Sequence, residues 1–237
     1  MADPRRRHAR SRAVGSSTAK VDPARLLAYD VMVAVREQGA YTNLALAAML
    51  RERGLAGRDA AFATELVAGT VRGQGTYDAV LTACVDRPLA EVDPAVLDAL
   101  RLGGHQLLAM RVPTHAAVST TVELVRARVG HGPAGFVNAV LRKVAAHELD
   151  GWLRRVAPDP TTDPVGFAAV AHSHPRWVVE ALGEALGEEA GSRGAAELDD
   201  LLAADNAAPK VTLVARPGLA GVAELVAAGG RASAMSP

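Results

Sequence analysis

Arginine is the residue type whose number and spacing in this sequence most readily suggest chemistry. The first twenty residues hold six Arg or Lys against one Asp, a local charge of +5. Arginines interrupted by Ser and Gly are too polar to bury and are well suited to phosphate contact. We therefore expect residues 1–21 to form a disordered arm, which serves either as a solubilising tail or to bind nucleic acid through Arg5, Arg6, Arg7, Arg10 and Arg12.

Further cations occur where the surrounding sequence favours helices. On the surface of a helical bundle they could contact phosphates together with the arm, although solvated surface charge explains each of them when it is considered singly. The candidate RNA contacts of this kind are Arg72, Arg101, Arg142 and Lys143.

The charge of the chain is distributed unevenly. The whole sequence has 26 basic and 26 acidic residues, yet residues 146–237 carry 7 basic and 13 acidic side chains. Because like charges repel, we expect this acidic part to stay away from phosphates.

The segment Gly130–Gly135 spells the G-x-G-x-x-G pattern of dinucleotide-binding sites. Such a fingerprint must follow a strand and open a βαβ unit, because the cofactor pyrophosphate lies at the end of a parallel sheet. Here a helical pattern precedes Gly130 and Pro133 opens the next helix. The pattern therefore predicts a turn between helices and no bound dinucleotide.

The sequence indicates no metal site and no catalytic pair. His172 and His174 lack a third ligand at a metal spacing, so we expect Ser173 or His174 to cap the helix that Pro175 begins, with Trp177 anchoring it. One cysteine, Cys84, excludes a disulfide scaffold and a zinc ribbon.

The composition favours an all-α protein. In 237 residues, 49% are apolar but only 3% are aromatic, so the core must consist of Leu, Val and Ala in closely packed helices. The chain has no run of eighteen apolar residues, and its start has no apolar core of a signal peptide. We expect a cytoplasmic protein without a membrane span.

Capping residues and apolar periodicity divide residues 22–156 into seven or eight short helices. Asp22-Pro23 and Asp93-Pro94 each place a capping Asp before a Pro at the first helical position. Gly103 and Gly104 weaken the second of these helices, which indicates close approach of a neighbour. The periodicity predicts a compact bundle whose core includes Leu100, Leu107, Val122, Phe136 and Val140.

The rest of the chain reads as a separate region. The turn-forming segment 157–165 predicts a linker, followed over 166–237 by a helical connector and the incomplete start of an α/β region. We expect helices over Pro175–Leu186, Ala195–Ala204 and Gly221–Ala228, and a strand over Lys210–Arg216. Because a lone strand needs a sheet, we expect a chain that is cut off there, whether naturally, by engineering or through an error in the gene assignment.

Several motifs, in this order, resemble the signatures of the NusB-type antitermination fold over residues 22 to about 150. Details such as Ser173-His174-Pro175-Arg176-Trp177 followed by Asn206 are more similar to the N-terminal region of the RsmB (Sun-type) ribosomal RNA cytosine-C5 methyltransferases. The motifs are Gly69-Thr70-Val71-Arg72, Leu100-Arg101-Leu102-Gly103-Gly104-His105-Gln106-Leu107-Leu108, Pro113-Thr114-His115-Ala116-Ala117-Val118, Val122-Glu123-Leu124 and Phe136-Val137-Asn138-Ala139-Val140-Leu141-Arg142.

This resemblance implies an all-helical RNA-binding domain of two small bundles, joined to a catalytic domain that uses S-adenosylmethionine. The family's cofactor loop, Asp-x-Cys-Ala-Ala-Pro-Gly-Gly-Lys, and its two catalytic cysteines are absent from this sequence. Cys84 lies in the helical domain and matches neither cysteine. The chemistry needs a thiolate beside a bound methyl donor, so we expect no catalytic residue and no cofactor in this chain.

The expected function is binding of RNA, specifically small-subunit ribosomal RNA, as the substrate-recognition part of such a methyltransferase with a role in rRNA processing. One alternative is a protein-interaction module that acts in transcription antitermination through the helical bundle. A second is an active S-adenosylmethionine-dependent methyltransferase whose catalytic domain is merely missing here.

Overall fold

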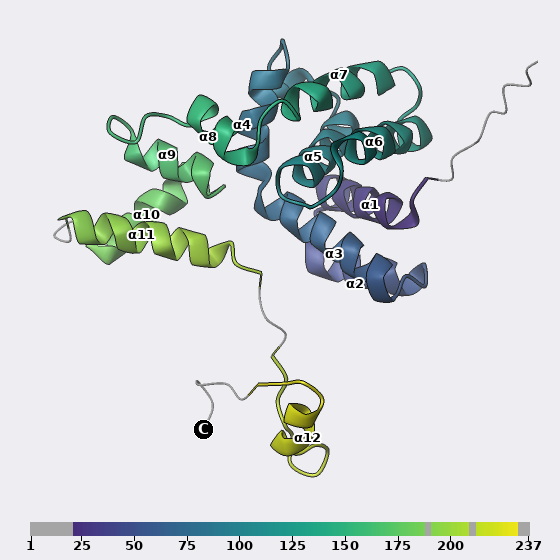
Figure 1. Cartoon of the computed structure of the whole chain (residues 1–237), viewed down its shortest axis with the longest axis vertical. Coiled ribbons are helices and arrows are strands. Elements are labelled where there is room, and N and C mark those ends of the chain that lie inside the picture. Colours follow the sequence, from purple (N-terminus) through teal and green to yellow (C-terminus); the bar gives the residue numbers. More distant parts are fainter. Residues whose placement is uncertain (1–20, 188–190, 209–211, 232–237) are drawn as a thin grey trace, which may run out of the picture.

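The computed structural model describes residues 21–187, 191–208 and 212–231, and all regular secondary structure in those ranges is helical (Figure 1). This confirms the all-α expectation for the bundle. The elements are α1 Pro23–Gln38, α2 Thr42–Glu52, α3 Gly57–Arg72, α4 Gln74–Cys84, the short 3-10 helix η1 Leu89–Glu91, α5 Pro94–Leu108, α6 Thr114–Arg128, α7 Ala134–Val144, α8 Leu149–Val156, α9 Pro164–Ala171, α10 Arg176–Leu186, α11 Gly191–Asp205 and α12 Val222–Ala227.

Asp-Pro pairs begin three of these helices. The Asp22 carboxylate accepts a hydrogen bond from the Arg25 backbone N–H at 2.8 Å, and Asp93 accepts one from Ala95 at the same distance, so both predicted caps are confirmed. Asp163 caps α9 in the same way. The last two residues of the predicted linker, 164 and 165, therefore already belong to a helix.

The first seven α-helices pack as two small groups around α5. Helices α1, α2 and α3 contact one another, α4 to α7 form the second group, and α5 joins the two by packing on α1 and α3. The fully buried side chains between them include Leu27, Leu66, Leu100, Leu124 and Leu141. The two small bundles that the family resemblance implies are thus present.

The predicted core is confirmed in part. Leu100, Val122 and Val140 are buried, whereas Leu107 and Phe136 are only partly buried and pack against the edge of the core. Close packing explains one of the two helical glycines, Gly103, because a Cβ there would meet the Leu141 methyl groups at 2.8–2.9 Å. A Cβ on Gly104 would meet nothing within 4 Å, so close packing does not explain that glycine.

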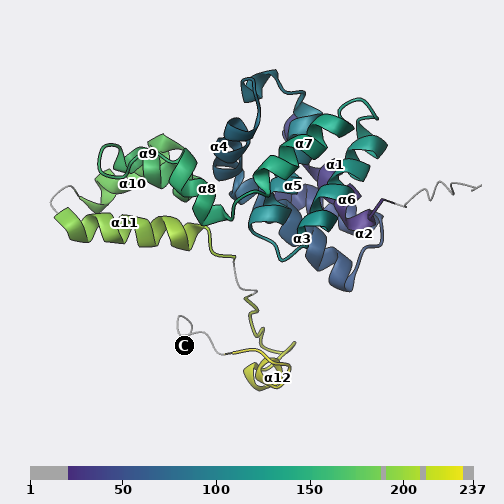
Figure 2. The same cartoon turned by 45° about the horizontal axis from the view of Figure 1, so that its top comes forward.

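Helices α8 to α11 form a further group beside the bundle, visible in both views (Figures 1 and 2). They reach it through α4, which contacts α8 and α9. The Ser173 hydroxyl accepts hydrogen bonds from the backbone N–H groups of Gly75 and Thr76 at 2.8 and 3.3 Å, and the Thr76 hydroxyl donates to the Val170 carbonyl at 2.6 Å. Ser173 therefore caps α4. The sequence predicts that Ser173 or His174 caps the helix that Pro175 begins, and Ser173 does not do so.

Trp177 also differs from the expectation. It lies in the first turn of α10 with 69% of its surface exposed, so it does not anchor that helix. Val179, two residues further on, is the side chain of this helix that is buried.

The expected strand over Lys210–Arg216 is wrong for residues 212–216, while residues 210 and 211 lie outside the described residues. Residues 212–216 have no regular secondary structure, and Leu213 and Val214 are 67% and 79% exposed. A strand is stabilised by hydrogen bonds to a partner strand, and the described ranges contain none. The α/β segment is therefore unsupported, while α12 matches the helix expected after Gly221.

Candidate nucleic-acid interface

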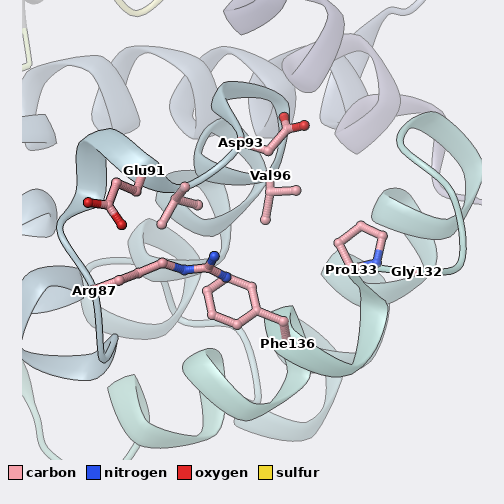
Figure 3. Close-up of a pocket in the computed structure, with 8 residues that line it drawn as sticks. Arg87, Glu91, Asp93, Val96, Gly132, Pro133 and Phe136 are labelled. Carbon is pink, nitrogen blue, oxygen red and sulfur yellow. The ribbon is translucent and has the colours of Figure 1, made fainter.

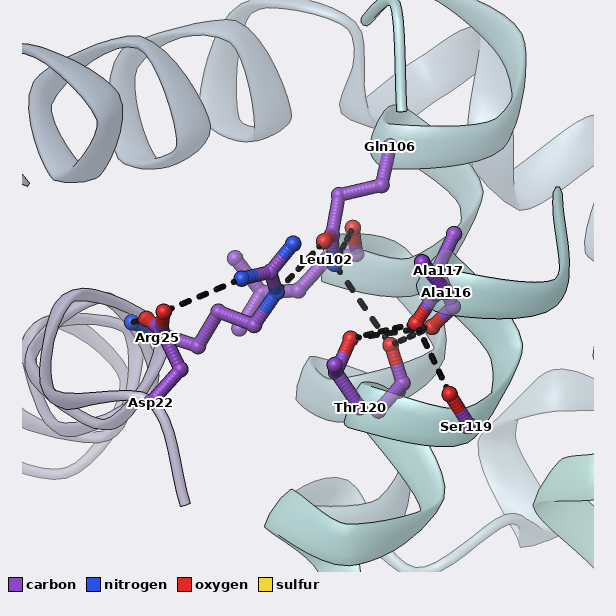
Figure 4. A network of polar contacts seen from close by, with 9 residues as sticks. Asp22, Arg25, Leu102, Gln106, Ala116, Ala117, Ser119 and Thr120 are labelled. Atoms are coloured by element: carbon purple, nitrogen blue, oxygen red, sulfur yellow. Dashed lines mark hydrogen bonds and ion pairs between the residues drawn. The ribbon is translucent and has the colours of Figure 1, made fainter. Parts of the chain in front are cut away.

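The arginines of the N-terminal arm, Arg5, Arg6, Arg7, Arg10 and Arg12, lie outside the described residues. The first described helix, α1, follows the arm in the sequence. The Arg25 guanidinium donates to the Gln106 amide oxygen at 2.8 Å and pairs with Asp22 at 3.3 Å (Figure 4). It also lies 4.6 Å from the centre of the Phe62 ring. These contacts hold the start of α1 against α5 and α3.

Gln106 completes this network from within the core. Its amide nitrogen donates to the Leu102 carbonyl at 3.2 Å and approaches the Thr121 hydroxyl at 3.5 Å (Figure 4). Burial lowers the pKa of Arg25, against the opposing effect of Asp22. Because the guanidinium is satisfied by these partners, Arg25 is a structural residue at the base of the arm.

Arg101 is occupied within the protein. Its Nε and Nη2 donate to the two carboxylate oxygens of Asp78 at 2.8 and 2.7 Å, and its Nη1 lies 3.8 Å from Asp98. Only 15% of its side chain is exposed. This bidentate pair joins α4 to α5 and leaves Arg101 little surface for a ligand.

The other three helix-borne candidates are more accessible. Arg72 is half-buried in the last turn of α3. Arg142 and Lys143 are exposed in the last turn of α7, where Arg142 Nε makes a long contact of 3.4 Å to Asn138 and Lys143 lies 3.5 Å from Asp86. Exposed pairs of this kind are weak, so both α7 cations are available to an anionic ligand.

A pocket of about 370 Å³ opens where the loop after α4 faces α7 (Figure 3). The Arg87 guanidinium lies over the Phe136 ring, 5.1 Å from its centre, in a cation–π arrangement. Gly132 and Pro133 form the far wall. The pocket is lined by Arg87, Glu91, Val92, Asp93, Val96, Gly132, Pro133 and Phe136.

This arrangement suits a planar, hydrogen-bonding group. Unpaired RNA bases stack on aromatic rings and guanidinium planes, and carboxylates such as Glu91 and Asp93 accept hydrogen bonds from base amino groups. Sequence reasoning missed Arg87 because it lies in a loop, 49 positions away from the ring it covers. Phe136 was assigned to the core, and its partial exposure depends on packing that periodicity does not reveal.

A glycine of α3 and a histidine of α5 meet inside the bundle. The Tyr77 hydroxyl lies 2.7 Å from His105 Nδ1, and a Cβ on Gly69 would overlap the imidazole ring. His105 Nε2 is buried, finds no hydrogen-bond partner among the described residues and lies 3.9 Å from the Glu65 carboxylate. Burial lowers the pKa of His105 to about 4, so the ring is neutral at pH 7.

Cys84 is buried in the core at the end of α4. Burial raises the pKa of its thiol to about 11. A nucleophilic cysteine needs an accessible thiolate, so the position of Cys84 fits a packing role. Among the described residues, no group of three or more metal-ligating side chains gathers, and no helix is long and apolar enough to span a membrane.

Comparison with known proteins identifies the class. The model of the NusB family matches residues 22–146, which are α1 to α7 and the turns around them. The chain therefore belongs to the NusB family.

The chain is also similar to longer proteins that are named as methyltransferases. A Mycobacterium tuberculosis protein, provisionally named as a methyltransferase, is 47% identical over 92% of this chain and 46% of its own length. A Bacillus subtilis protein, provisionally named ribosomal RNA small subunit methyltransferase B, is 30% identical over 73% of this chain and 38% of its own. Ribosomal RNA small subunit methyltransferase B of Thermus thermophilus is 38% identical over 57% and 33%. The chain thus spans less than half the length of these relatives.

Proposed function

We propose that this chain binds single-stranded or looped RNA as the substrate-recognition part of a ribosomal RNA (cytosine-C5) methyltransferase of the RsmB type. Its NusB family membership and its similarity to proteins named as small-subunit ribosomal RNA methyltransferases support this proposal. In the complete relatives, S-adenosylmethionine would be the methyl donor.

The observation that carries the proposal is the Arg87–Phe136 stack at the pocket. Lys143 of α7 lies 3.5 Å from Asp86, which precedes Arg87 in the chain. An unpaired base stacked there would leave its phosphates near the surface on which Arg142 and Lys143 lie. The arm arginines would add further phosphate contacts from the start of α1. A regular duplex does not offer unstacked bases, so it should bind less tightly than a single strand.

Two substitutions at Arg87 test the stacking separately from the charge. Arg87→Lys keeps the charge but removes the planar guanidinium, so we expect RNA affinity to fall by about 5- to 10-fold, which corresponds to the lower end of the stacking energies of about 1–3 kcal/mol per base. The slope of log affinity against log salt should stay unchanged. Arg87→Gln should lower both the affinity and the slope. Fluorescence anisotropy with an unstructured RNA oligonucleotide over a salt series measures both quantities.

Arg111→Gln is the matched control, because Arg111 is an exposed arginine outside the pocket, in the turn between α5 and α6. It should change neither quantity appreciably. If Arg87→Lys binds RNA as tightly as the unchanged protein, or if Arg111→Gln weakens binding equally, the pocket is not the base-binding site.

Exposed Trp177 favours a second candidate function, binding of a protein partner as expected for a NusB-type antitermination module. Large exposed aromatic side chains are enriched at protein interfaces. No RNA binding at low salt, together with a partner whose binding survives ribonuclease and is lost in Trp177→Ala, would favour this function. Calorimetry with S-adenosylmethionine tests the remaining alternative, that this chain binds the methyl donor itself.

A further inference from the structure

Two arginines converge on one aspartate where α1, α2 and α6 meet. Arg53, which follows α2, donates from Nη2 to Asp30 Oδ2 at 2.7 Å. Arg128, at the end of α6, donates from Nε and Nη2 to Asp30 Oδ1 and Oδ2 at 2.9 and 2.7 Å. Residues far apart in the sequence are thus gathered around one carboxylate.

The charge of this cluster is not balanced. Asp30 neutralises one of the two guanidinium charges, and among the described residues no second carboxylate lies within ion-pair distance of either arginine. The cluster therefore carries a net charge of +1.

The three side chains differ in how far they are exposed to solvent. Asp30 is 20% exposed, whereas Arg53 and Arg128 are 32% and 38% exposed. The carboxylate thus lies beneath two arginines that reach the surface. Arg53 Nε and Nη1 and Arg128 Nη1 make no hydrogen bond within the described part of the chain and remain free to donate.

Such an arrangement is preorganised for an anion. A guanidinium matches the oxygens of a phosphate with paired N–H donors, and holding two of them in place beforehand reduces the entropy lost on binding. Stability alone is a weak explanation for the cluster, because ion pairs near the surface contribute little to the free energy of unfolding.

We propose that Arg53 and Arg128, held by Asp30, bind a backbone phosphate of the RNA. The proposal rests on the RNA-binding function and adds to it a phosphate site on the α1–α2–α6 side of the bundle. Pro133, five residues after Arg128, lines the base pocket, so the loop after α6 connects the two sites along the chain.

The charge count makes a specific prediction for RNA binding. In Arg53→Gln or Arg128→Gln, the remaining arginine is neutralised by Asp30, so either single variant should lose the phosphate contact. Each should reduce the salt slope by about 0.7 of a logarithmic unit, the value for one phosphate of a single strand. The double variant, made together with Asp30→Asn so that no unpaired carboxylate is left to repel phosphate, should reduce it by about the same amount, because the site is already lost.

Arg51→Gln is the matched control, since Arg51 is an exposed arginine in the last turn of α2 with no carboxylate partner in the described structure. It should leave the slope nearly unchanged. Circular dichroism and chemical denaturation establish that every variant is folded. A double variant whose loss equals the sum of the two single losses, or a control that loses as much as Arg53→Gln, would overturn the shared site.

A measurement without RNA separates this proposal from the proposed function. Inorganic phosphate should shift the arginine Nε–H signals of Arg53 and Arg128 in nitrogen-15 NMR spectra, and Arg128→Gln should abolish the shift of Arg53. If RNA fails to bind but these shifts occur, the anion site stands and the RNA function fails. If RNA binds with slopes unaffected by both substitutions and phosphate shifts neither signal, the site itself is refuted.

Discussion

At the scale of single residues, His105 combines burial with an incomplete set of partners. Tyr77 binds its Nδ1 at 2.7 Å, while the buried Nε2 has no hydrogen bond. A proton on Nε2 would place a charge in the core, and the Glu65 carboxylate 3.9 Å away is exposed to solvent. The neutral ring is therefore the form that the fold requires.

This burial predicts a pH dependence of stability. The pKa of His105 is about 4 in the folded protein, against about 6.5 in an unfolded chain, so only the unfolded chain takes up the proton between these values. The contribution of neutral, buried His105 to the free energy of unfolding is therefore fully present above pH 6.5 and is lost as the pH falls toward 4. Between pH 6.5 and 5, the free energy of unfolding should fall by roughly 1.5–2 kcal/mol from this group.

Urea denaturation at several pH values measures this effect. His105→Gln removes the titrating group, so its stability should vary less over the same interval, although the variant is less stable at pH 7. An identical dependence on pH in both proteins would show that His105 does not cause it.

At the scale of elements, glycines decide how closely the helices approach. Gly69 lies in the interior of α3, where the imidazole of His105 from α5 occupies the space of its missing Cβ. Gly104 lies in the interior of α5, where that space is empty. Two helical glycines thus have opposite packing environments.

Alanine substitutions at these two positions should therefore have opposite effects. Gly69→Ala should destabilise the protein by about 1–3 kcal/mol, because the added methyl group displaces the ring that Tyr77 holds. Gly104→Ala should stabilise it by about 0.5–1 kcal/mol, because alanine is the better helix former and meets no atom. Chemical denaturation of both variants measures the change in the free energy of unfolding. Destabilisation by Gly104→Ala would contradict the packing described for α5.

At the scale of the whole molecule, the distribution of charge favours one orientation toward RNA. The arm and the NusB-family bundle carry the candidate phosphate contacts, while residues 146–237 carry six more acidic than basic side chains. Opposite charges at the two ends of a molecule orient it as it approaches a polyanion. RNA should therefore approach the bundle and leave α8 to α11 free.

Deletion of residues 1–20 tests the contribution of the arm to RNA binding. Each phosphate contact of the arm adds about 0.7 to the salt slope on single-stranded RNA, so the shortened chain should bind more weakly and with a flatter slope. Anisotropy with the same oligonucleotide for both chains gives the two slopes. Equal slopes would remove the arm from the interface and assign the electrostatic contacts to the bundle.

Local sequence signals determined much of this fold. The Asp-Pro caps before α1 and α5 and the apolar periodicity of the first seven helices depend on neighbours within one or two turns, so they can be read from the chain. The family motifs likewise lie on contiguous segments. The same local reasoning wrongly predicted a strand over residues 212–216, because a strand depends on a partner that its own sequence does not specify.

The candidate sites were decided by the tertiary structure. Arg101 and Arg142 are both arginines in predicted helices. In the structure, Asp78 binds Arg101, whereas Arg142 has only a long contact to Asn138 and stays at the surface. Arg87 meets Phe136, and Arg53 meets Arg128 over Asp30, only because distant helices pack together. The sequence therefore determined which elements form and which residue types are present. The packing of α1 to α7 decided which cations remain free to bind, because a charged side chain is available to a ligand only where no internal partner binds it.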